Sequence, residues 1–164
     1  MHPARIPPAD LLRDCDETRT RRGGPGGQHR NKVETAVVLR HRATGVTAEA
    51  AERRSQAENR HVALRRLRMR LAQEHREPPG EAPSALWRSR AAGGRLVVAA
   101  DHDDYPALVA EALDRIVADS LDMPRAATAL AVTPSQLVRL LAREPAALVV
   151  LNRLRGAAGL GPLR

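Results

Sequence analysis

The fold depends on the stretch Val33-Glu34-Thr35-Ala36-Val37-Val38-Leu39-Arg40, which combines β-branched residues with a period of two. Every second residue is aliphatic or β-branched and shares one face of the predicted strand: Val33, Thr35, Val37 and Leu39. Such alternation is typical of a strand with one face buried against a core. The strand therefore needs partners, and the flanking sequence supplies a candidate on each side.

Two further strands are predicted next to this stretch. Cys15 to Arg22 is a short and weaker candidate on the N-terminal side. On the other side, Ala43-Thr44-Gly45 is typical of a turn, and Val46 to Ala50 can then return as the second strand of a hairpin. Together the three segments predict one small antiparallel sheet.

A long helix is predicted after the sheet. Ser55-Gln56-Ala57-Glu58 has the form of a capping box, in which Ser55 caps the helix and Glu58 reaches back to the Ser55 amide. We expect the helix to run to His75, with an apolar stripe formed by Leu64, Leu67 and Leu71. The arginines outside this stripe should lie, for the most part, on a solvated face: Arg60, Arg65, Arg68 and Arg76.

Shifts in composition divide the chain into segments. Residues 1–14 are proline-rich and aperiodic, which predicts a flexible lead-in to a domain over residues 15–77. The run Pro78-Pro79-Gly80-Glu81-Ala82-Pro83 begins a predicted linker over residues 78–94. Residues 95–164 should be mainly helical, with Arg95 to Ala99 either a short strand or the end of the linker. The expected helices are Tyr105 to Leu121, Pro124 to Ala131, Pro134 to Ala142 and Pro145 to Arg155. The predicted fold class is α+β.

The helical part contains a segment with the rhythm of a helix-turn-helix, from Ala126 to Leu141. Its second helix carries only Arg139 and, just beyond, Arg143, which is little for reading nucleic acid. We therefore favour a compact helical bundle that packs on the first domain or binds a protein partner.

The charge of the chain is positive and uneven. The formal net charge is +8; residues 1–77 hold 17 basic and 10 acidic side chains, and residues 78–164 hold 10 and 9. This concentration in the first half predicts contact with a polyanion there. Phe is absent and the only aromatic residues are Trp87 and Tyr105, so base stacking on an aromatic platform is a poor candidate for the main contact.

Composition also excludes several kinds of protein. Cys15 is the only cysteine, so no internal disulfide is possible and a cysteine-based zinc site lacks ligands. We expect neither a metal nor a cofactor. No apolar run approaches the ~20 residues of a membrane span, and Met1 to Arg13 lacks the apolar core of a signal peptide. These features predict a cytoplasmic protein without a membrane partner. We also expect a monomer.

The candidate chemical motif is the turn Gly24-Pro25-Gly26-Gly27-Gln28. Two consecutive glycines permit backbone angles closed to other residues and leave no side chain between the chain and its target. The Gln28 amide is no useful base at neutral pH, but it can orient a water, and its backbone N–H can stabilise negative charge developing on oxygen. This chemistry suits hydrolysis of an already activated ester.

The surrounding residues match a known family. They are the run from Gly24 to Val37, then His41, Thr44-Gly45-Val46, Arg54-Ser55-Gln56, Asn59-Arg60 and Ala63-Leu64. In order and spacing these blocks strongly resemble the catalytic domain of class I peptide chain release factors. The resemblance implies a small α+β unit whose Gly-Gly-Gln loop enters the peptidyl-transferase centre and promotes hydrolysis of peptidyl-tRNA. It assigns Gly26, Gly27 and Gln28 to that loop.

Two clusters are predicted to contact RNA. The first flanks the glycine-rich turn and can neutralise phosphates: Arg21, Arg22, Arg30 and Lys32. The second lies at the start of the long helix, where free N–H groups also favour anions: Arg53, Arg54, Gln56, Asn59 and Arg60. His29 and His41 need no catalytic role, because no partner acid stands at a recognisable spacing.

The length of the chain leaves no room for the domains with which full-length release factors read stop codons. We therefore expect codon-independent release on stalled ribosomes, with large-subunit rRNA and peptidyl-tRNA as partners. Relatives in that rescue branch carry a lysine- and arginine-rich C-terminal tail, which is absent here. Two alternatives stay open: a non-catalytic RNA- or DNA-binding module with a helix-turn-helix-like C-terminal part, and a protein that recruits a rescue partner through its C-terminal helices.

Overall fold

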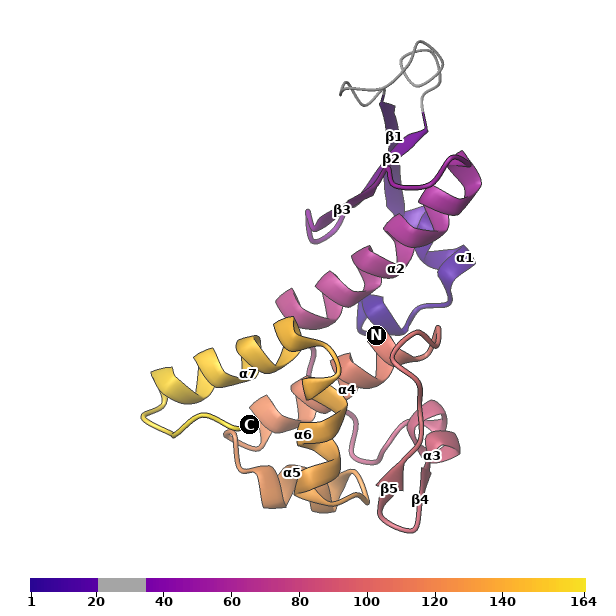
Figure 1. The fold of residues 1–164 in the computed structure, drawn as a ribbon. Coiled ribbons are helices and arrows are strands. Elements are labelled where there is room, and N and C mark those ends of the chain that lie inside the picture. Colours follow the sequence, from indigo (N-terminus) through magenta and orange to yellow (C-terminus); the bar gives the residue numbers. More distant parts are fainter. Residues whose placement is uncertain (21–34) are drawn as a thin grey trace.

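The computed structural model describes residues 1–20 and 35–164, which form a mixed α+β fold (Figure 1). The first part of the chain has these elements in order: η1 Pro3–Arg5, α1 Pro8–Leu11, η2 Leu12–Asp14, β1 Cys15–Thr20, β2 Ala36–His41, β3 Thr47–Ala50 and α2 Gln56–Glu74. The second part continues with α3 Ala85–Arg90, β4 Ala91–Ala92, β5 Arg95–Leu96, α4 Tyr105–Ala118, α5 Met123–Ala129, α6 Pro134–Ala142 and α7 Pro145–Ala157.

The sheet has the order β1-β2-β3, and both pairings are antiparallel, as predicted. Thr20 is the register partner of Ala36, and Val37 is the partner of Ala50. On the predicted inner face of β2, Val37 and Leu39 are fully buried. They face α2, which covers one side of the sheet. Val33, which was predicted for the same face, lies outside the described residues.

Helix α2 confirms Ser55 as the N-cap, whereas the predicted return contact from the Glu58 side chain to the Ser55 amide is absent among the described residues. The Ser55 hydroxyl accepts a hydrogen bond from the Glu58 amide at 3.4 Å, and the helix ends at Glu74, with His75 as its C-cap. Leu67 and Leu71 are fully buried and Leu64 is 7% exposed, so the apolar stripe faces the core.

One arginine of α2 departs from the predicted solvated face. Arg68 is only 5% exposed and donates hydrogen bonds to the carbonyls of Asp103 (2.6 Å) and Ala4 (3.2 Å). Burial lowers the pKa of its guanidinium from the ordinary value. The guanidinium donates to carbonyls of residues that are distant in the sequence, which allows the charged side chain to be buried. The local sequence pattern alone predicts that this side chain is exposed to solvent.

The N-terminal segment is not a flexible lead-in. Short helical turns carry Ala4 and Leu11 into the core, where both are fully buried. His2 is 1% exposed, and its Nε2 donates to the carbonyl of His75 at 3.1 Å. The prediction was wrong because prolines and very short turns give no periodic signal, whereas the apolar side chains are held by α2.

The predicted linker is also ordered in its second part. Ser84 caps α3 by accepting a hydrogen bond from the Trp87 amide at 3.0 Å. Trp87 is fully buried and its indole Nε1 donates to the Leu130 carbonyl at 2.8 Å. A helix of six residues is too short to show a hydrophobic period, so its sequence reads as part of the linker.

The four predicted C-terminal helices are present with small shifts of their ends. Helix α4 ends at Ala118 rather than at Leu121 because Ser120 and Leu121 adopt positive φ angles of 56° and 65°, which cannot continue a right-handed helix. Arg95–Leu96 pairs with Ala91–Ala92 as a two-stranded hairpin.

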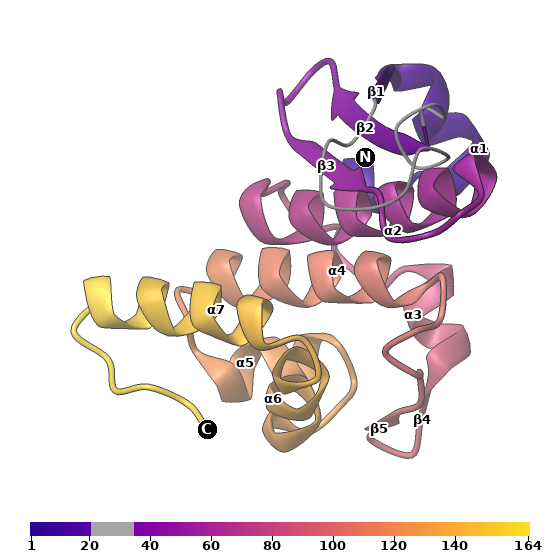
Figure 2. The same cartoon turned by 45° about the horizontal axis from the view of Figure 1, so that its top comes forward.

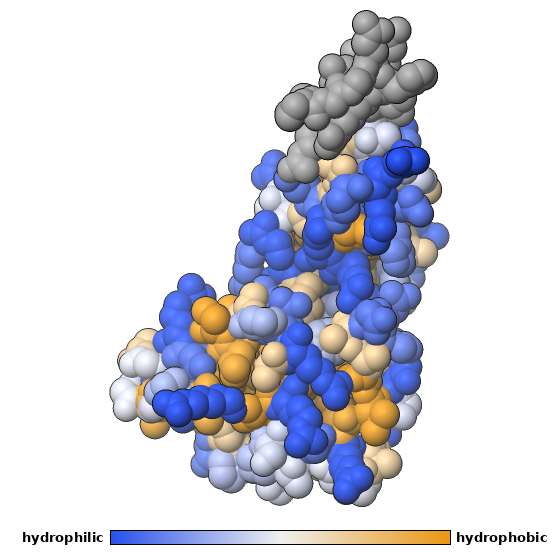
Figure 3. All heavy atoms as spheres, in the orientation of Figure 1, coloured by the Kyte–Doolittle hydropathy of each residue, from blue (hydrophilic) through white to orange (hydrophobic). Residues whose placement is uncertain are grey.

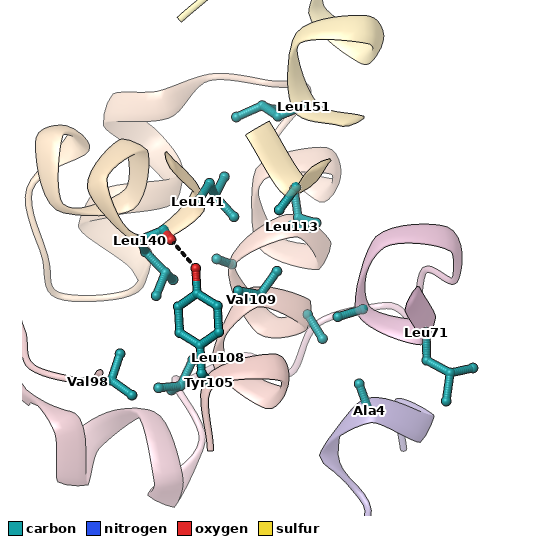
Figure 4. Packing of buried hydrophobic residues seen from close by; sticks show 14 of the residues in the cluster. Ala4, Leu71, Val98, Tyr105, Leu108, Val109, Leu113, Leu140, Leu141 and Leu151 are labelled. Atoms are coloured by element: carbon teal, nitrogen blue, oxygen red, sulfur yellow. Dashed lines mark hydrogen bonds between the residues drawn. The ribbon is translucent and has the colours of Figure 1, made fainter. Parts of the chain in front are cut away.

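Helix α4 joins the two halves of the molecule. It runs beside α2, as both ribbon views show, and packs on its other side against α5 and α6 (Figures 1 and 2). Figure 4 shows side chains from both halves in one cluster, where the Tyr105 hydroxyl donates to the Leu140 carbonyl at 2.6 Å. The chain therefore has one continuous core rather than two cores separated by a linker.

Candidate functional site

The predicted catalytic residues Gly26, Gly27 and Gln28 lie outside the described residues, together with Arg21, Arg22, Arg30 and Lys32. The structure does define the two points where the segment that carries them joins the sheet. These are Thr20, the last residue of β1, and Ala36, the first of β2. They are direct register partners, so the segment leaves and re-enters the sheet at neighbouring positions.

Asn59 fastens this base of the segment to α2. Its side-chain Nδ2 donates to the carbonyls of Thr35 (2.6 Å) and Arg53 (3.0 Å), and its Oδ1 accepts from the Arg53 amide at 2.9 Å. The residue is fully buried. Its role is therefore structural rather than the predicted contact with RNA, because it joins the start of β2 to the loop before α2.

Arg60 is exposed, but its guanidinium forms an ion pair with a residue of the sheet, Glu17. Its Nε lies 2.7 Å from Glu17 Oε2, and Arg19 holds the other oxygen of the same carboxylate at 3.2 Å. Partial burial acts to raise the pKa of Glu17, but the hydrogen bonds from Arg60 and Arg19 bring it below its ordinary value. The Arg60–Glu17 pair ties α2 to β1, as Asn59 ties α2 to the start of β2.

Arg53 and Arg54 are the members of the second cluster that present a cation to solvent. Both are exposed, and within residues 1–20 and 35–164 no carboxylate lies within ion-pair distance of either guanidinium. They directly precede the N-terminus of α2, where free N–H groups add positive potential. Gln56, the first residue of α2, is half-buried beside them. Two cations and a helix N-terminus thus lie next to the base of the segment 21–34.

Titratable groups at the opposite end of the β1–β2 pair, where Cys15 is the register partner of His41, have structural roles. His41 is 4% exposed and its Nδ1 lies 2.9 Å from the Thr44 hydroxyl, with burial lowering the pKa of the imidazole. Burial raises the pKa of the Cys15 thiol to about 11, and the thiol donates to the Leu11 carbonyl at 3.2 Å. A thiol with that pKa is no nucleophile at neutral pH. Across the described residues, no group of three or more His, Cys, Asp or Glu side chains is placed to hold a metal ion.

Hydrophilic side chains cover most of the surface around α2 and the sheet on the face shown in Figure 3. On the same face, apolar residues gather over α7 and beside β5. In the sequence, Val149 belongs to α7 and Val97 directly follows β5, and their exposed fractions are 66% and 70%. Within the part of the chain that the structure describes, no helix is both long and apolar enough to cross a membrane.

Comparison with known proteins gives the class to which this fold belongs. The model of the RF-1 domain family matches residues 5–97, more than half of the chain, and the chain belongs to this family. The match extends beyond residues 15–77 at both ends. It includes part of the packed N-terminal segment and continues through α3 and the β4–β5 hairpin.

Several curated relatives are peptide chain release factors. The chain is 45% identical over 82 residues to peptide chain release factor PrfB1, chloroplastic, of Arabidopsis thaliana, covering 45% of this chain and 18% of that protein. It is 42% identical over 89 residues to peptide chain release factor 1 of Symbiobacterium thermophilum, covering 54% and 24%. It is 47% identical over 66 residues to peptide chain release factor 2 of Variovorax paradoxus, covering 40% and 17%. The similarity thus spans about a quarter or less of each of these relatives.

Proposed function

We propose that this protein hydrolyses the ester of peptidyl-tRNA on the ribosome, with Gly26, Gly27 and Gln28 at the reacting centre. The observation that carries the proposal is the conjunction of this triplet with an RF-1 domain whose sheet and α2 are fastened at the base of the segment 21–34. Arg53 and Arg54 supply exposed positive charge at the same base. A rigid base of this kind suits a loop that must be aimed at a target.

The chemistry needs little from the protein. A water adds to the carbonyl carbon of the ester, the bond to the ribose oxygen breaks, and that oxygen takes a proton, leaving free peptide and tRNA. We assign the Gln28 side-chain amide to orienting the water and its backbone N–H to stabilising the oxyanion. Gly26 and Gly27 would allow the backbone to approach the ester without an intervening side chain.

We further propose that release is independent of a stop codon. The similarity to termination factors is confined to one domain, about a quarter or less of their length. The residues beyond that domain, 98–164, form α4–α7, and these helices pack on α2 through α4. Ribosomes stalled on truncated mRNA are therefore the proposed substrate.

Peptide release in vitro tests both statements. Radiolabelled peptidyl-tRNA complexes are prepared on truncated mRNA and, separately, on mRNA that presents a stop or a sense codon. We expect release from the truncated complexes alone. Gly26→Ala and Gly27→Ala should abolish it, while Gly156→Ala, an open helical position where an added Cβ meets nothing within 4 Å, should not. Full release by either loop variant would overturn the catalytic assignment, and release confined to stop codons would overturn codon independence.

A further inference from the structure

The near-neutral charge of residues 78–164 conceals two segments of opposite sign. Residues 81–122 hold eight carboxylates and four arginines, whereas residues 123–164 hold six arginines and one carboxylate, Glu144. The six arginines are Arg125, Arg139, Arg143, Arg153, Arg155 and Arg164. Helices α5–α7 and the residues after them are therefore strongly basic.

Many of the carboxylates in the acidic segment are engaged away from this basic region. Asp114 lies 3.2 Å from Arg76, Asp104 lies 2.6 Å from Arg90, and Glu111 accepts from the amide and hydroxyl of Ser84. These contacts fix the C-terminal helices to the RF-1 domain. Most of the positive charge of α5–α7 is therefore uncompensated, although Arg125 lies 3.3 Å from Asp119.

A hollow of about 460 Å³ lies beside α6 within this basic region. One wall is the outer face of α6, with Ser135, Val138, Arg139 and Ala142 at helical spacing. The other wall is formed by Leu163 and Arg164, and Met123 and Pro134 complete the lining. We call this hollow the α6 groove.

The second wall is held in place by specific contacts. Asn152 on α7 donates to the Leu163 carbonyl at 3.0 Å and accepts from the Leu163 amide at 2.8 Å. Arg155 donates to the Gly161 carbonyl at 2.9 Å. Residues 158–164 are thereby folded back from α7, and Arg164 lines the same groove as Arg139.

The two groove arginines have no internal charge partner. In the described part of the chain, no carboxylate lies within 4.0 Å of the guanidinium of Arg139 or Arg164. A second and larger hollow, of about 610 Å³ beside α2, differs in this respect: its lining includes Arg53, Arg65, Arg66 and Arg70, but also Glu49, Glu52 and Glu144. The α6 groove is therefore the better phosphate site.

We propose that the α6 groove binds the phosphodiester backbone of RNA, with Arg139 and Arg164 contacting phosphates. The choice of RNA rests on the proposed function, which places the protein on an RNA particle. Apart from Arg139, the outer face of α6 offers one hydroxyl, Ser135, and the apolar side chains of Val138 and Ala142, so it lacks the several polar groups that reading a base sequence needs. The contact is thus with the backbone and is independent of sequence.

The test measures binding of the full chain to a fluorescently labelled RNA hairpin at several salt concentrations. Arg139→Ala/Arg164→Ala is compared with Arg13→Ala/Arg88→Ala, which removes the same charge from exposed positions on η2 and α3. We expect the groove variant to bind more weakly than the control at low salt. Its dependence of log K on log salt should be less steep than that of the wild type by about 1.8, about 0.9 for each phosphate that is no longer neutralised.

Further arms separate this proposal from the proposed function. Gln28→Ala should bind the hairpin like the wild type. The hairpin assay does not depend on peptide release, so failure of release in the ribosome assay would overturn the proposed function without affecting the result for the α6 groove. Equal affinity and slope in the groove and control variants would overturn the proposal. So would tighter binding to a DNA duplex than to the RNA hairpin. A loss of ribosome binding with unchanged hairpin binding would show that the groove holds a protein instead.

Discussion

At the scale of single residues, buried polar side chains decide how the base of the segment 21–34 is held. Asn59 makes three hydrogen bonds to backbone groups of Thr35 and Arg53 from a fully buried position. Asn59→Ala leaves those groups unpaired, so we expect the free energy of unfolding to fall by about 3 kcal/mol. Urea denaturation measures the decrease.

The matched control for Asn59 is Gln56→Ala, one turn earlier on α2 and half-buried. We expect this variant to lose less than about 1 kcal/mol. Peptide release should fall with Asn59→Ala although its side chain is fully buried. Equal stability of the two variants would contradict the structural role assigned to Asn59.

His2 gives the fold a dependence on pH. Its Nε2 donates to the His75 carbonyl and its Nδ1 accepts from the Ala4 amide, so the buried ring is held neutral. Burial lowers its pKa from 6.5 to about 4, a change to which nearby Arg76 and His75 contribute. Because the unfolded chain binds this proton first, stability is full above pH 6.5 and is lost as the pH falls toward 4.

The size of this effect follows from the pKa shift. Between pH 7 and pH 4, the wild type should lose up to about 3 kcal/mol more unfolding free energy than His2→Gln, which has no proton to bind. Urea titrations of both proteins at several pH values measure the difference. Parallel pH profiles for the two proteins would show that His2 does not couple to folding.

At the scale of elements, the sequence predicts the helices and strands that show a periodic pattern of apolar residues or a local capping motif. The alternation in β2 and the capped, striped pattern of α2 place both elements, and four C-terminal helices are found near their predicted bounds. The N-terminal turns and α3 escape prediction because each is short and is held by distant residues, such as His75 for His2 and Leu130 for Trp87. Such short elements are stabilised by contacts with residues distant in the sequence, and a local sequence pattern contains no information about those contacts.

The same reasoning applies to the candidate site. Residue type and spacing identify the glycine-rich turn and the cations near it. They do not distinguish Arg53 and Arg54, which face solvent, from Asn59, which is buried one turn into α2. An asparagine in the first turns of a helix can either hydrogen-bond to nearby backbone groups or contact a ligand. For Asn59, the position of the Thr35 backbone beside α2 decides between these two roles.

Helix α3 depends on its single tryptophan. Trp87→Phe keeps a ring in the core but removes the indole N–H that donates to the Leu130 carbonyl. We expect a decrease of about 2 kcal/mol in the free energy of unfolding from the unpaired carbonyl and the space left behind. Arg88→Ala, at the exposed neighbouring position, is the control and should change stability by less than about 0.5 kcal/mol. Thermal unfolding followed by circular dichroism distinguishes the two results.

At the scale of the whole molecule, the RF-1 domain and the C-terminal helices share one core and a set of polar contacts. Arg68 donates to the Asp103 carbonyl, and Arg76 pairs with Asp114 on α4. Because these contacts and the α2–α4 packing cross the boundary at residue 97, the α6 groove keeps a fixed position relative to the sheet. RNA bound in the α6 groove would therefore orient the sheet as well.

A shared core predicts that both halves unfold together. Trp87 fluorescence reports the boundary between them, and far-UV circular dichroism is dominated by α2 and α4–α7. The two signals should follow one urea transition with a common midpoint. Two separate transitions would show that the halves are independent.

A chain of residues 1–97 should lack the cooperative transition, because removal of α4 leaves Leu71 and its neighbours without their packing partners. The groove variant is therefore a sharper test of RNA binding than a truncation, since it removes two exposed side chains and leaves the core intact.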